Sequence, residues 1–332
     1  MVGGKNVPHA SGEPCLLAMD GGGSKTLLVL INRDAVVRDV RRAGGTNPFD
    51  RPDWRMEMAG LLADLPGGIV AAGFGMAGYG GSPTVSACQD DLLVEWGRCP
   101  YIVCNDVDIA CAGAFGGGAG ILLLAGTGSM VWATDQTGQA LRVGGWGHLF
   151  GDEGSAFWIG REALGTLTRG LDGREPEATS FVTPFCRFMG FPDDPGAIEG
   201  ALLDWYGGLS HARSAVAALS RGVDELAAAG NRSAQRIVEG AAAHLARHVD
   251  AARRRLRQPD LPWCDAGGAF RNASLRRAVV DLCGVPVAPL LPPVGGAALL
   301  AARRAGWDPD AAWIARLRKG LTDAGLFVPA LS

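Results

Sequence analysis

Two short glycine-rich turns, each between apolar runs, carry hydroxyl side chains that could bind phosphate. Residues 16–26 read LLAMDGGGSKT and residues 121–129 read ILLLAGTGS, and an apolar run follows each of them. Both patterns predict a strand, a tight turn and a second strand, with glycines supplying the positive φ angles that tight hairpins need. Backbone N–H groups in such turns can approach an anion closely. Two copies about 100 residues apart predict duplicated halves that close on one polyphosphate. The candidate phosphate ligands are Gly22, Gly23, Ser24, Lys25 and Thr26 in the first turn, and Gly126, Thr127, Gly128 and Ser129 in the second.

Two carboxylates stand where predicted strands end, and both could serve phosphoryl transfer. Asp20 faces the first turn, where it would repel phosphate unless a divalent cation lay between them. Mg²⁺, held directly or through water, is the natural candidate, and a turn-capping Asp is the alternative. Asp106 follows the predicted strand 101–104 and could accept the proton of an attacking hydroxyl. Asp108 is a rival base, which we expect instead to cap the segment 109–114.

The densest motif is GGWGHLFGDEGS at residues 144–155. Small residues around Trp146 would let the backbone pass close to a ligand, and the indole ring offers an apolar face of the kind that packs on a sugar. Asp152 and Glu153 could accept hydrogen bonds from hydroxyls. A helix start with acidic first-turn residues explains these two carboxylates equally well, but it does not explain the G-G-W-G run. His148 is expected to be structural.

A third glycine-rich turn, AGGAFRN at residues 266–272, ends a predicted strand and opens a helix. Gly267 and Gly268 would let the base and ribose of a nucleotide lie against the backbone. Asn272 could cap the helix or hydrogen-bond the nucleoside.

Two other glycine patterns resemble nucleotide motifs but lack their context. The first turn departs from a P-loop, because Ser24 precedes Lys25 and a strand follows rather than a helix. Gly73-x-Gly75-x-x-Gly78 matches a dinucleotide fingerprint, but the first strand does not carry it and no acidic residue follows at the expected spacing. We therefore interpret it as a glycine-rich loop that lines a cleft.

Strands and helices alternate along the chain, which predicts an α/β fold. In the first part, strands are expected at 15–19, 27–31, 36–41, 69–72 and 101–104, with helices near 54–65 and 85–97. In the second, strands are expected at 121–125, 130–133, 140–143, 263–266 and 285–288. Helices are expected at about 154–169, 211–229, 233–257, 274–282, 294–304 and 308–317, and residues 171–210 are expected to be irregular.

This order predicts two lobes that each begin with the same βββα pattern. Residues 1–13 are expected to form a flexible extension, 14–117 the N-terminal lobe, and 118–304 the C-terminal lobe with a helical insertion. A final helix, within about 305–332, is expected to pack back on the first lobe. The cleft between the lobes is the default ligand site.

Composition narrows the class of partner. The chain has 332 residues, 48% hydrophobic and 20% charged, with a net charge of −3. This balance is typical of a globular protein and argues against a nucleic-acid or anionic-membrane partner held by bulk charge. The chain has no apolar run of membrane-spanning length and its start lacks a signal-peptide core, so a cytoplasmic location is expected. Its eight cysteines form no C-x-x-C pair, which disfavours a metal cluster.

Together these motifs resemble the N-acetylglucosamine kinase family, within the actin–hexokinase ATPase superfamily and the branch that holds the BadF/BcrA-type ATPases. The resemblance extends from about Leu16 to Gly306, and its most specific part is GGWGHLFGDEGSAFW at 144–158. It implies a two-lobed actin/hexokinase-like (ribonuclease H-like) fold with duplicated βββαβα lobes. The implied activity is phosphorylation of an amino sugar by ATP with Mg²⁺, by an enzyme that forms a homodimer.

The resemblance also implies roles for single residues. Ser24 and Thr127 would meet ATP phosphates, whereas Gly267, Gly268 and Asn272 would lie on the adenosine side, with Ala217 as a looser match beside adenine. Asp106 would be the catalytic base. The sugar would be held by Asn47, Asp106, Gly145, Trp146, Gly147 and Asp152.

The expected reaction converts N-acetylglucosamine to N-acetylglucosamine 6-phosphate. Relatives that phosphorylate glucosamine or N-acetylmuramate leave those sugars as alternatives. A regulator or activator that hydrolyses ATP without a sugar is the alternative of another class, although the iron–sulfur activators of this branch lack the GWGH-x-x-GDEGS run.

Overall fold

The computed structural model describes residues 12–328, apart from the side chain of Pro195, and the chain divides into two compact units. Unit 1 combines the chain up to Ala119 with the segment from Ala288 onward, and unit 2 comprises Gly120–Val287. The extension expected at 1–13 lies almost wholly outside the described residues. Helix α11 (Pro293–Arg304), which the sequence assigns to the C-terminal lobe, belongs to unit 1.

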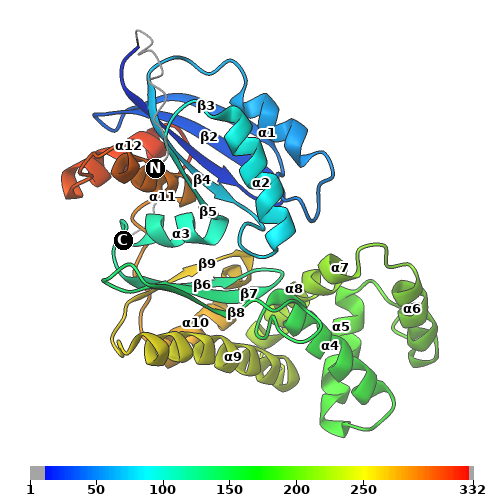
Figure 1. The fold of residues 1–332 in the computed structure, drawn as a ribbon. Coiled ribbons are helices and arrows are strands. Elements are labelled where there is room, and N and C mark those ends of the chain that lie inside the picture. Colours follow the sequence, from blue (N-terminus) through cyan, green and yellow to red (C-terminus); the bar gives the residue numbers. More distant parts are fainter. Residues whose placement is uncertain (1–11, 329–332) are drawn as a thin grey trace. The chain divides into compact units, whose positions relative to one another are not determined.

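Unit 1 is built on a five-stranded sheet with the order β3-β2-β1-β4-β5. Its strands are β1 (Cys15–Gly21), β2 (Lys25–Asn32), β3 (Val37–Gly44), β4 (Ile69–Met76) and β5 (Tyr101–Asn105). The first three form an antiparallel meander, whereas β1, β4 and β5 run parallel. The carboxyl ends of the three parallel strands therefore meet at one edge of the sheet (Figure 1). Asp20 lies near the end of β1 and Asp106 directly follows β5, so both are at this edge.

Helices cover both faces of this sheet. They are α1 (Trp54–Leu62) and α2 (Pro83–Trp96) on one face, and α3 (Asp106–Ala114), α11 and α12 (Ala311–Asp323) on the other. Side chains alternate between the faces, as the two-residue period of a strand requires: Leu17 packs with α1 and α2, and Leu16 with α11 and α12. The final helix thus returns to the unit that contains β1.

The fingerprint glycines serve helix packing. A Cβ atom on Gly73 would lie 2.2 Å from the Ala297 carbonyl oxygen of α11, and one on Gly75 would lie 2.2 Å from Ile109 Cδ1 of α3. Both glycines are inside β4, not in a loop, which corrects the interpretation from the sequence.

Unit 2 repeats the strand order of unit 1. Its sheet has the order β8-β7-β6-β9, with β6 (Gly120–Ala125), β7 (Ser129–Thr134), β8 (Ala140–Gly144) and β9 (Trp263–Ala266). Here β6 pairs antiparallel with β7 and parallel with β9, just as β1 pairs with β2 and β4. Helix α9 (Arg232–Leu256) packs against β6, β7 and β8, and α10 (Ala273–Cys283) packs on α9. The predicted duplication of a βββ start is therefore confirmed.

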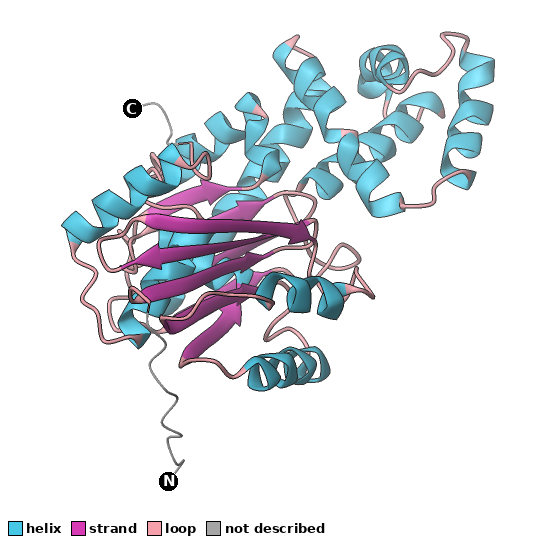
Figure 2. Cartoon of the chain, turned by 90° about the horizontal axis from the view of Figure 1, so that it is seen from above, coloured by secondary structure: helices cyan, strands magenta, loops and turns pink. Residues whose placement is uncertain are grey.

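A cluster of helices is inserted between β8 and β9, and its outer members lie away from the strands (Figure 2). Its α-helices are α4 (Ala156–Leu171), α5 (Thr179–Phe188), α6 (Pro195–Gly207), α7 (Ala212–Ala218) and α8 (Ser220–Ala228). The expectation that residues 171–210 are irregular is wrong, because they contain α5 and α6. Pro195 is the first residue of α6, a position where its missing N–H costs nothing.

Two other expected elements differ from the structure. The helix expected at 211–229 is divided at Leu219, where the N–H of Leu219 donates to the Val216 carbonyl in a tight turn. The strand expected at 285–288 is not formed, and the N–H of Val287 donates a single bond to the Trp263 carbonyl (2.8 Å). Within residues 12–328, no helix combines the length and apolar character needed to span a bilayer.

Candidate active site

The first glycine-rich turn joins β1 to β2 and exposes Ser24 at its tip. The turn closes through a hydrogen bond from the N–H of Gly22 to the Lys25 carbonyl (3.0 Å). Neither Gly22 nor Gly23 has a positive φ angle, so the expected reason for glycine in this turn is wrong. Close packing requires glycine at two neighbouring positions instead: a Cβ atom on Gly21 would lie 2.7 Å from Thr46 Oγ1, and one on Gly45 would lie 1.9 Å from the Gly23 carbonyl oxygen.

The hydroxyl of Thr26 is not presented to a ligand. Thr26 is buried, and its Oγ1 donates to the Gly44 carbonyl (2.9 Å) and lies 2.9 Å from Thr46 Oγ1. This corrects the expectation that Thr26 donates to phosphate. Asn47 follows Thr46 beside the same turn, where its amide donates to the Asp50 carboxylate. The side chains of Ser24 and Lys25 are exposed.

The two candidate carboxylates lie close enough to influence each other. Asp20 is near the end of β1, and Asp106 is the first residue of α3, directly after β5. Burial, and secondly the negative charge of Asp106, raise the pKa of Asp20 to about 6, while Lys25 opposes the rise. Burial also raises the pKa of Asp106, although backbone N–H groups at the helix start favour its ionised form. Unit 1 thus contains a pair of partly buried carboxylates at one sheet edge.

The start of α3 separates the roles of the two rival aspartates. Asn105 caps this helix, and its side-chain oxygen accepts a bond from the N–H of Val107 (3.2 Å). The Asp108 carboxylate accepts a bond from the N–H of Asn105 (3.1 Å), which completes a capping box. The expectation that Asp108 caps this helix is therefore confirmed, and Asp106 is left as the candidate base.

The second turn joins β6 to β7 and exposes Thr127. The N–H of Gly126 donates to the Gly128 carbonyl (2.8 Å), again without a positive φ angle at either glycine. Ser129 is 3% exposed, and its hydroxyl donates to the Glu153 carbonyl (2.7 Å). Its side chain therefore holds the turn to the GDEGS segment instead of facing a ligand, which corrects the expectation for that hydroxyl.

The G-G-W-G segment begins at Gly144, the last residue of β8, and does use left-handed backbone. Gly144, Gly145 and Gly147 have φ angles of +73°, +71° and +89°, conformations that disfavour any side chain. The N–H of Gly145 donates to the Ser129 carbonyl (3.1 Å), so this segment is bonded to the second turn. Trp146 is 62% exposed, as an aromatic platform for a ligand would be.

Asp152 connects three parts of unit 2. It is 3% exposed, and its φ angle of +57° is rare for a residue with a side chain. Its Oδ1 accepts from the N–H of Ser129 (3.4 Å), and its Oδ2 pairs with Arg213 Nη2 of α7 (2.8 Å). Sequence reasoning missed Arg213, because no motif surrounds it and 61 residues separate it from its partner.

One pocket of about 770 Å³ brings together most of the residues expected on the adenosine side. Its lining comprises Gly126, Thr127, Ala156, Ser214, Ala217, Ala218, Ser220, Arg221, Asp224, Glu225, Gly268, Ala269, Arg271 and Asn272. Four separate stretches of sequence thus meet at one cavity, and the loosely matched Ala217 is among them. Gly267 is adjacent: its φ angle is +100°, and a Cβ atom there would lie 2.3 Å from the Ala125 carbonyl oxygen.

Asn272 supplies an unused donor at this pocket. Its Oδ1 caps α10 by accepting from the N–H of Leu275 (2.6 Å). Its Nδ2 is buried, and within the described part of the chain it has no hydrogen-bond partner. A buried donor without a partner costs free energy, so a ligand acceptor in the pocket would be favoured.

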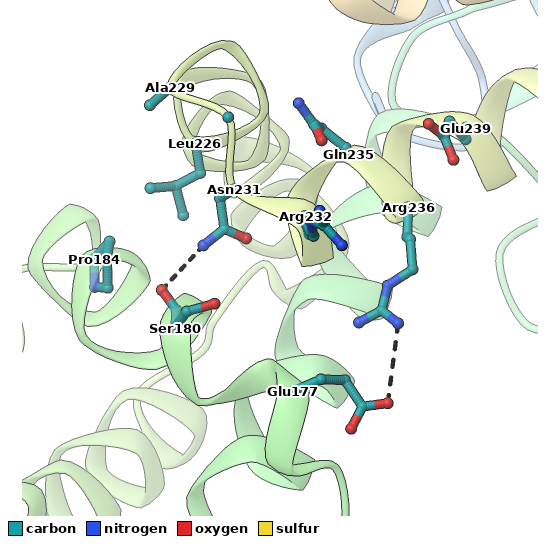
Figure 3. A pocket seen from close by; sticks show the side chains of 11 residues that line it. Glu177, Ser180, Pro184, Leu226, Ala229, Asn231, Arg232, Gln235, Arg236 and Glu239 are labelled. Carbon is teal, nitrogen blue, oxygen red and sulfur yellow. Dashed lines mark hydrogen bonds and ion pairs between the residues drawn. The ribbon is translucent and has the colours of Figure 1, made fainter.

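A larger pocket of about 970 Å³ lies elsewhere in unit 2, between α5 and the turn from α8 to α9 (Figure 3). At this pocket the side-chain amide of Asn231 donates a hydrogen bond to the Ser180 carbonyl (3.0 Å), and the Arg236 guanidinium lies 4.0 Å from the Glu177 carboxylate. No residue predicted from the sequence lines it.

The two α/β units share one strand order, and unit 1 holds a carboxylate pair whereas unit 2 holds a glycine-lined pocket. This architecture is an actin–hexokinase-like ATPase fold, and solved structures share it. A candidate N-acetylglucosamine kinase from Chromobacterium violaceum superposes with a TM-score of 0.64 at 25% identity, covering 87% of this chain and 99% of the other. A candidate N-acetylglucosamine kinase from Porphyromonas gingivalis gives a TM-score of 0.58 at 18% identity, over 92% and 99%.

The chain belongs to the BadF/BadG/BcrA/BcrD ATPase family, whose model matches residues 17–301. It is also 30% identical over 168 residues to an N-acetylmuramic acid/N-acetylglucosamine kinase from Clostridium acetobutylicum. That match covers 48% of this chain and 55% of the relative, so the chain spans about half the length of the curated relative that it matches.

Proposed function

We propose that this protein is an ATP-dependent sugar kinase that phosphorylates the C6 hydroxyl of an amino sugar, with N-acetylglucosamine as the first candidate. The observation that carries the proposal is the pocket of unit 2, where Thr127, Ala217, Gly268 and Asn272 converge. Membership in an ATPase family supports ATP as the nucleotide, and the similarity to sugar kinases supports a sugar as the acceptor.

In this proposal the pocket residues bind the nucleoside and the two turns bind the phosphates. Gly268 leaves room for the nucleoside, since a Cβ atom there would meet nothing within 4 Å, and Asn272 Nδ2 donates to it. Ser24 and Thr127 are the exposed hydroxyls of the two turns, and both would donate to phosphate oxygens. Backbone N–H groups of the turns would stabilise charge on the transferring group.

Asp106 is the proposed base. It would orient the sugar hydroxyl and accept its proton during transfer to the γ-phosphate. Burial raises the pKa of its carboxyl, which brings its basicity closer to that needed near neutral pH. The capping box holds the helix start at which Asp106 lies, so its position is fixed by local structure.

The carboxylate pair fits a magnesium site. Asp20 carries a raised pKa because it is buried and close to Asp106, and a divalent cation would relieve this repulsion. Within residues 12–328, no group of three or more acidic, histidine or cysteine side chains could hold a metal. Asp20 would therefore hold Mg²⁺ together with water and phosphate oxygens, a common arrangement for this ion. The ion, when bound, supplies neutralisation of phosphate charge.

The proposed sugar ligands are Asn47, Gly145, Trp146, Gly147 and Asp152, in addition to Asp106. Trp146 is the exposed platform, and the left-handed glycines on either side of it let the backbone come close. We also propose that the protein is a cytoplasmic homodimer, and that its partner is a small-molecule sugar and not a nucleic acid or a membrane. Sedimentation of the purified protein would test the dimer.

ADP release from ATP and Mg²⁺, with and without single sugars, tests the proposal. The panel comprises N-acetylglucosamine, glucosamine, N-acetylmuramate, N-acetylmannosamine and glucose. We expect one N-acetylated hexosamine to stimulate ADP release strongly. Equal ADP release with and without every sugar would instead support an ATP-hydrolysing regulator.

A further inference from the structure

Two arginines flank the segment proposed to hold the sugar, and no sequence motif indicates either of them. The Arg142 guanidinium of β8 lies 4.6 Å from the centroid of the Trp146 ring. The Arg213 guanidinium of α7 pairs with Asp152 (2.8 Å). One cation thus stacks on the proposed sugar platform and another pairs with a proposed sugar ligand, so the charge of the ligand becomes a question.

Arg213 is fixed in place but remains accessible. The side chain of Asp152 is 4% exposed, whereas that of Arg213 is 45% exposed. A Cβ atom on Gly128 would lie 2.8 Å from both Arg213 Nη2 and Asp152 Oδ2, so this glycine makes room for the pair. A guanidinium has five N–H donors in a planar fork, and the bonds found within residues 12–328 engage only Nη2 of Arg213.

Arg213 adjoins both proposed ligand sites, because its Nη2 faces Gly128 of the second turn and pairs with Asp152 of the proposed sugar site. The nucleotide pocket is lined by Ser214, Ala217 and Ala218 of the same helix, but not by Arg213. Arg213 instead contacts Asp152, which belongs to the proposed sugar site. A planar guanidinium matches a carboxylate through two parallel hydrogen bonds.

We propose that Arg213, positioned by Asp152, binds a carboxylate carried by the sugar, so that use of an acidic amino sugar depends on this residue. N-acetylmuramate, which is N-acetylglucosamine with a lactyl ether, is the substrate of this class to test, and the Clostridium relative is named for both sugars. The proposal rests on the proposed function, since it assigns a specificity residue within the same sugar site.

The test compares kcat/KM for N-acetylmuramate and N-acetylglucosamine in one preparation of each variant. The ratio is the readout, because loss of folding or of phosphate binding would lower both values together. In Arg213→Met, we expect the ratio of N-acetylmuramate to N-acetylglucosamine to fall by about 10- to 100-fold, the usual effect of a lost charged hydrogen bond. Arg161→Met, which removes an exposed arginine of α4 that pairs with its neighbour Glu162, is the matched control and should leave the ratio unchanged.

Arg213→Lys is the second variant, chosen so that the test does not depend on the folding of Arg213→Met. It keeps a positive charge beside the buried Asp152 but removes the planar guanidinium. Its ratio should also fall, by less than that of Arg213→Met. Equal losses for both sugars in the two variants would overturn the inference and indicate a phosphate-binding or structural role. A wild-type enzyme that uses N-acetylglucosamine but not N-acetylmuramate would overturn the inference alone. Failure with every amino sugar of the panel would overturn the proposed function as well.

Discussion

The two glycine-rich turns occupy corresponding positions in the two units but offer different chemistry. Each follows the first strand of a βββ meander, and each has an exposed hydroxyl at its tip and a buried hydroxyl at its end. The buried ones, Thr26 and Ser129, bond to neighbouring segments of their own unit. The first turn lies beside a carboxylate pair, whereas the second lines a pocket and adjoins the Asp152–Arg213 pair.

This difference separates scaffold from function. Strand order and the buried hydroxyls are common to both units, so they report on the fold. The carboxylate pair belongs to unit 1, and the pocket and the Asp152–Arg213 pair belong to unit 2. These features therefore report on the roles that we propose for the two units: acid–base chemistry in unit 1, and binding of nucleoside and sugar in unit 2. Substitutions in corresponding positions should therefore have different consequences.

The largest effect is expected from removal of the base in unit 1. Asp106→Asn should lower kcat by a factor on the order of 10² to 10⁴, with little change in the KM for the sugar, because the amide keeps the shape but cannot accept the proton. Steady-state kinetics with the preferred sugar would check this. Asp108→Asn, at the capping-box position, is the control, and its effect should appear in stability; near-normal turnover in Asp106→Asn would reject the assignment.

A moderate effect is expected in the pocket of unit 2. Asn272→Ser keeps an oxygen that can cap α10 but replaces the amide donor Nδ2 by a shorter hydroxyl, so the KM for ATP should rise by about tenfold while the melting temperature is retained. Asn272→Ala removes both functions and should also cost about 1 kcal/mol of stability. If the serine variant bound ATP normally, Asn272 would be a helix cap and nothing more.

The fold was largely predictable, because strands and glycine turns leave local signals. Every strand of both sheets was expected within a few residues, whereas α5 and α6 were missed because Pro184, Pro195 and several glycines were interpreted as breaks. Four residues that the motifs and the resemblance pointed to line one pocket, namely Thr127, Ala217, Gly268 and Asn272. No motif pointed to Arg213, whose partner is distant in sequence. The sequence also predicted positive φ angles at the turn glycines, which they do not have. Gly128 is instead required by packing against Arg213 and Asp152, two residues that meet only in the folded chain.

A smaller effect should distinguish the exposed from the buried hydroxyls. Thr26→Val leaves the Gly44 carbonyl and Thr46 without their partner, and should cost about 1 to 3 kcal/mol in the free energy of unfolding. Ser24→Ala removes an exposed hydroxyl and should leave stability unchanged while raising the KM for ATP. Urea denaturation combined with ATP titration checks both, and the comparison fails if Ser24→Ala is the more destabilised variant.

A further effect concerns pH. The pKa of Asp20 rises from 3.8 to about 6 on folding, so the folded protein keeps a proton that the unfolded chain releases between these values. Stability should therefore fall as pH rises through this window, and Asp20→Asn should flatten that part of the profile. Denaturation midpoints at several pH values from 4 to 7 would check this. A profile of the same slope in wild type and variant would show that Asp20 has an ordinary pKa.

Phosphorus NMR of the reaction products tests the central claim most directly. With ATP, Mg²⁺ and N-acetylglucosamine, we predict a new phosphomonoester resonance coupled to the two C6 protons of the sugar, formed in step with ADP and formed far more slowly by Asp106→Asn. Consumption of ATP that yields only inorganic phosphate, with each candidate amino sugar left unmodified, would contradict the account.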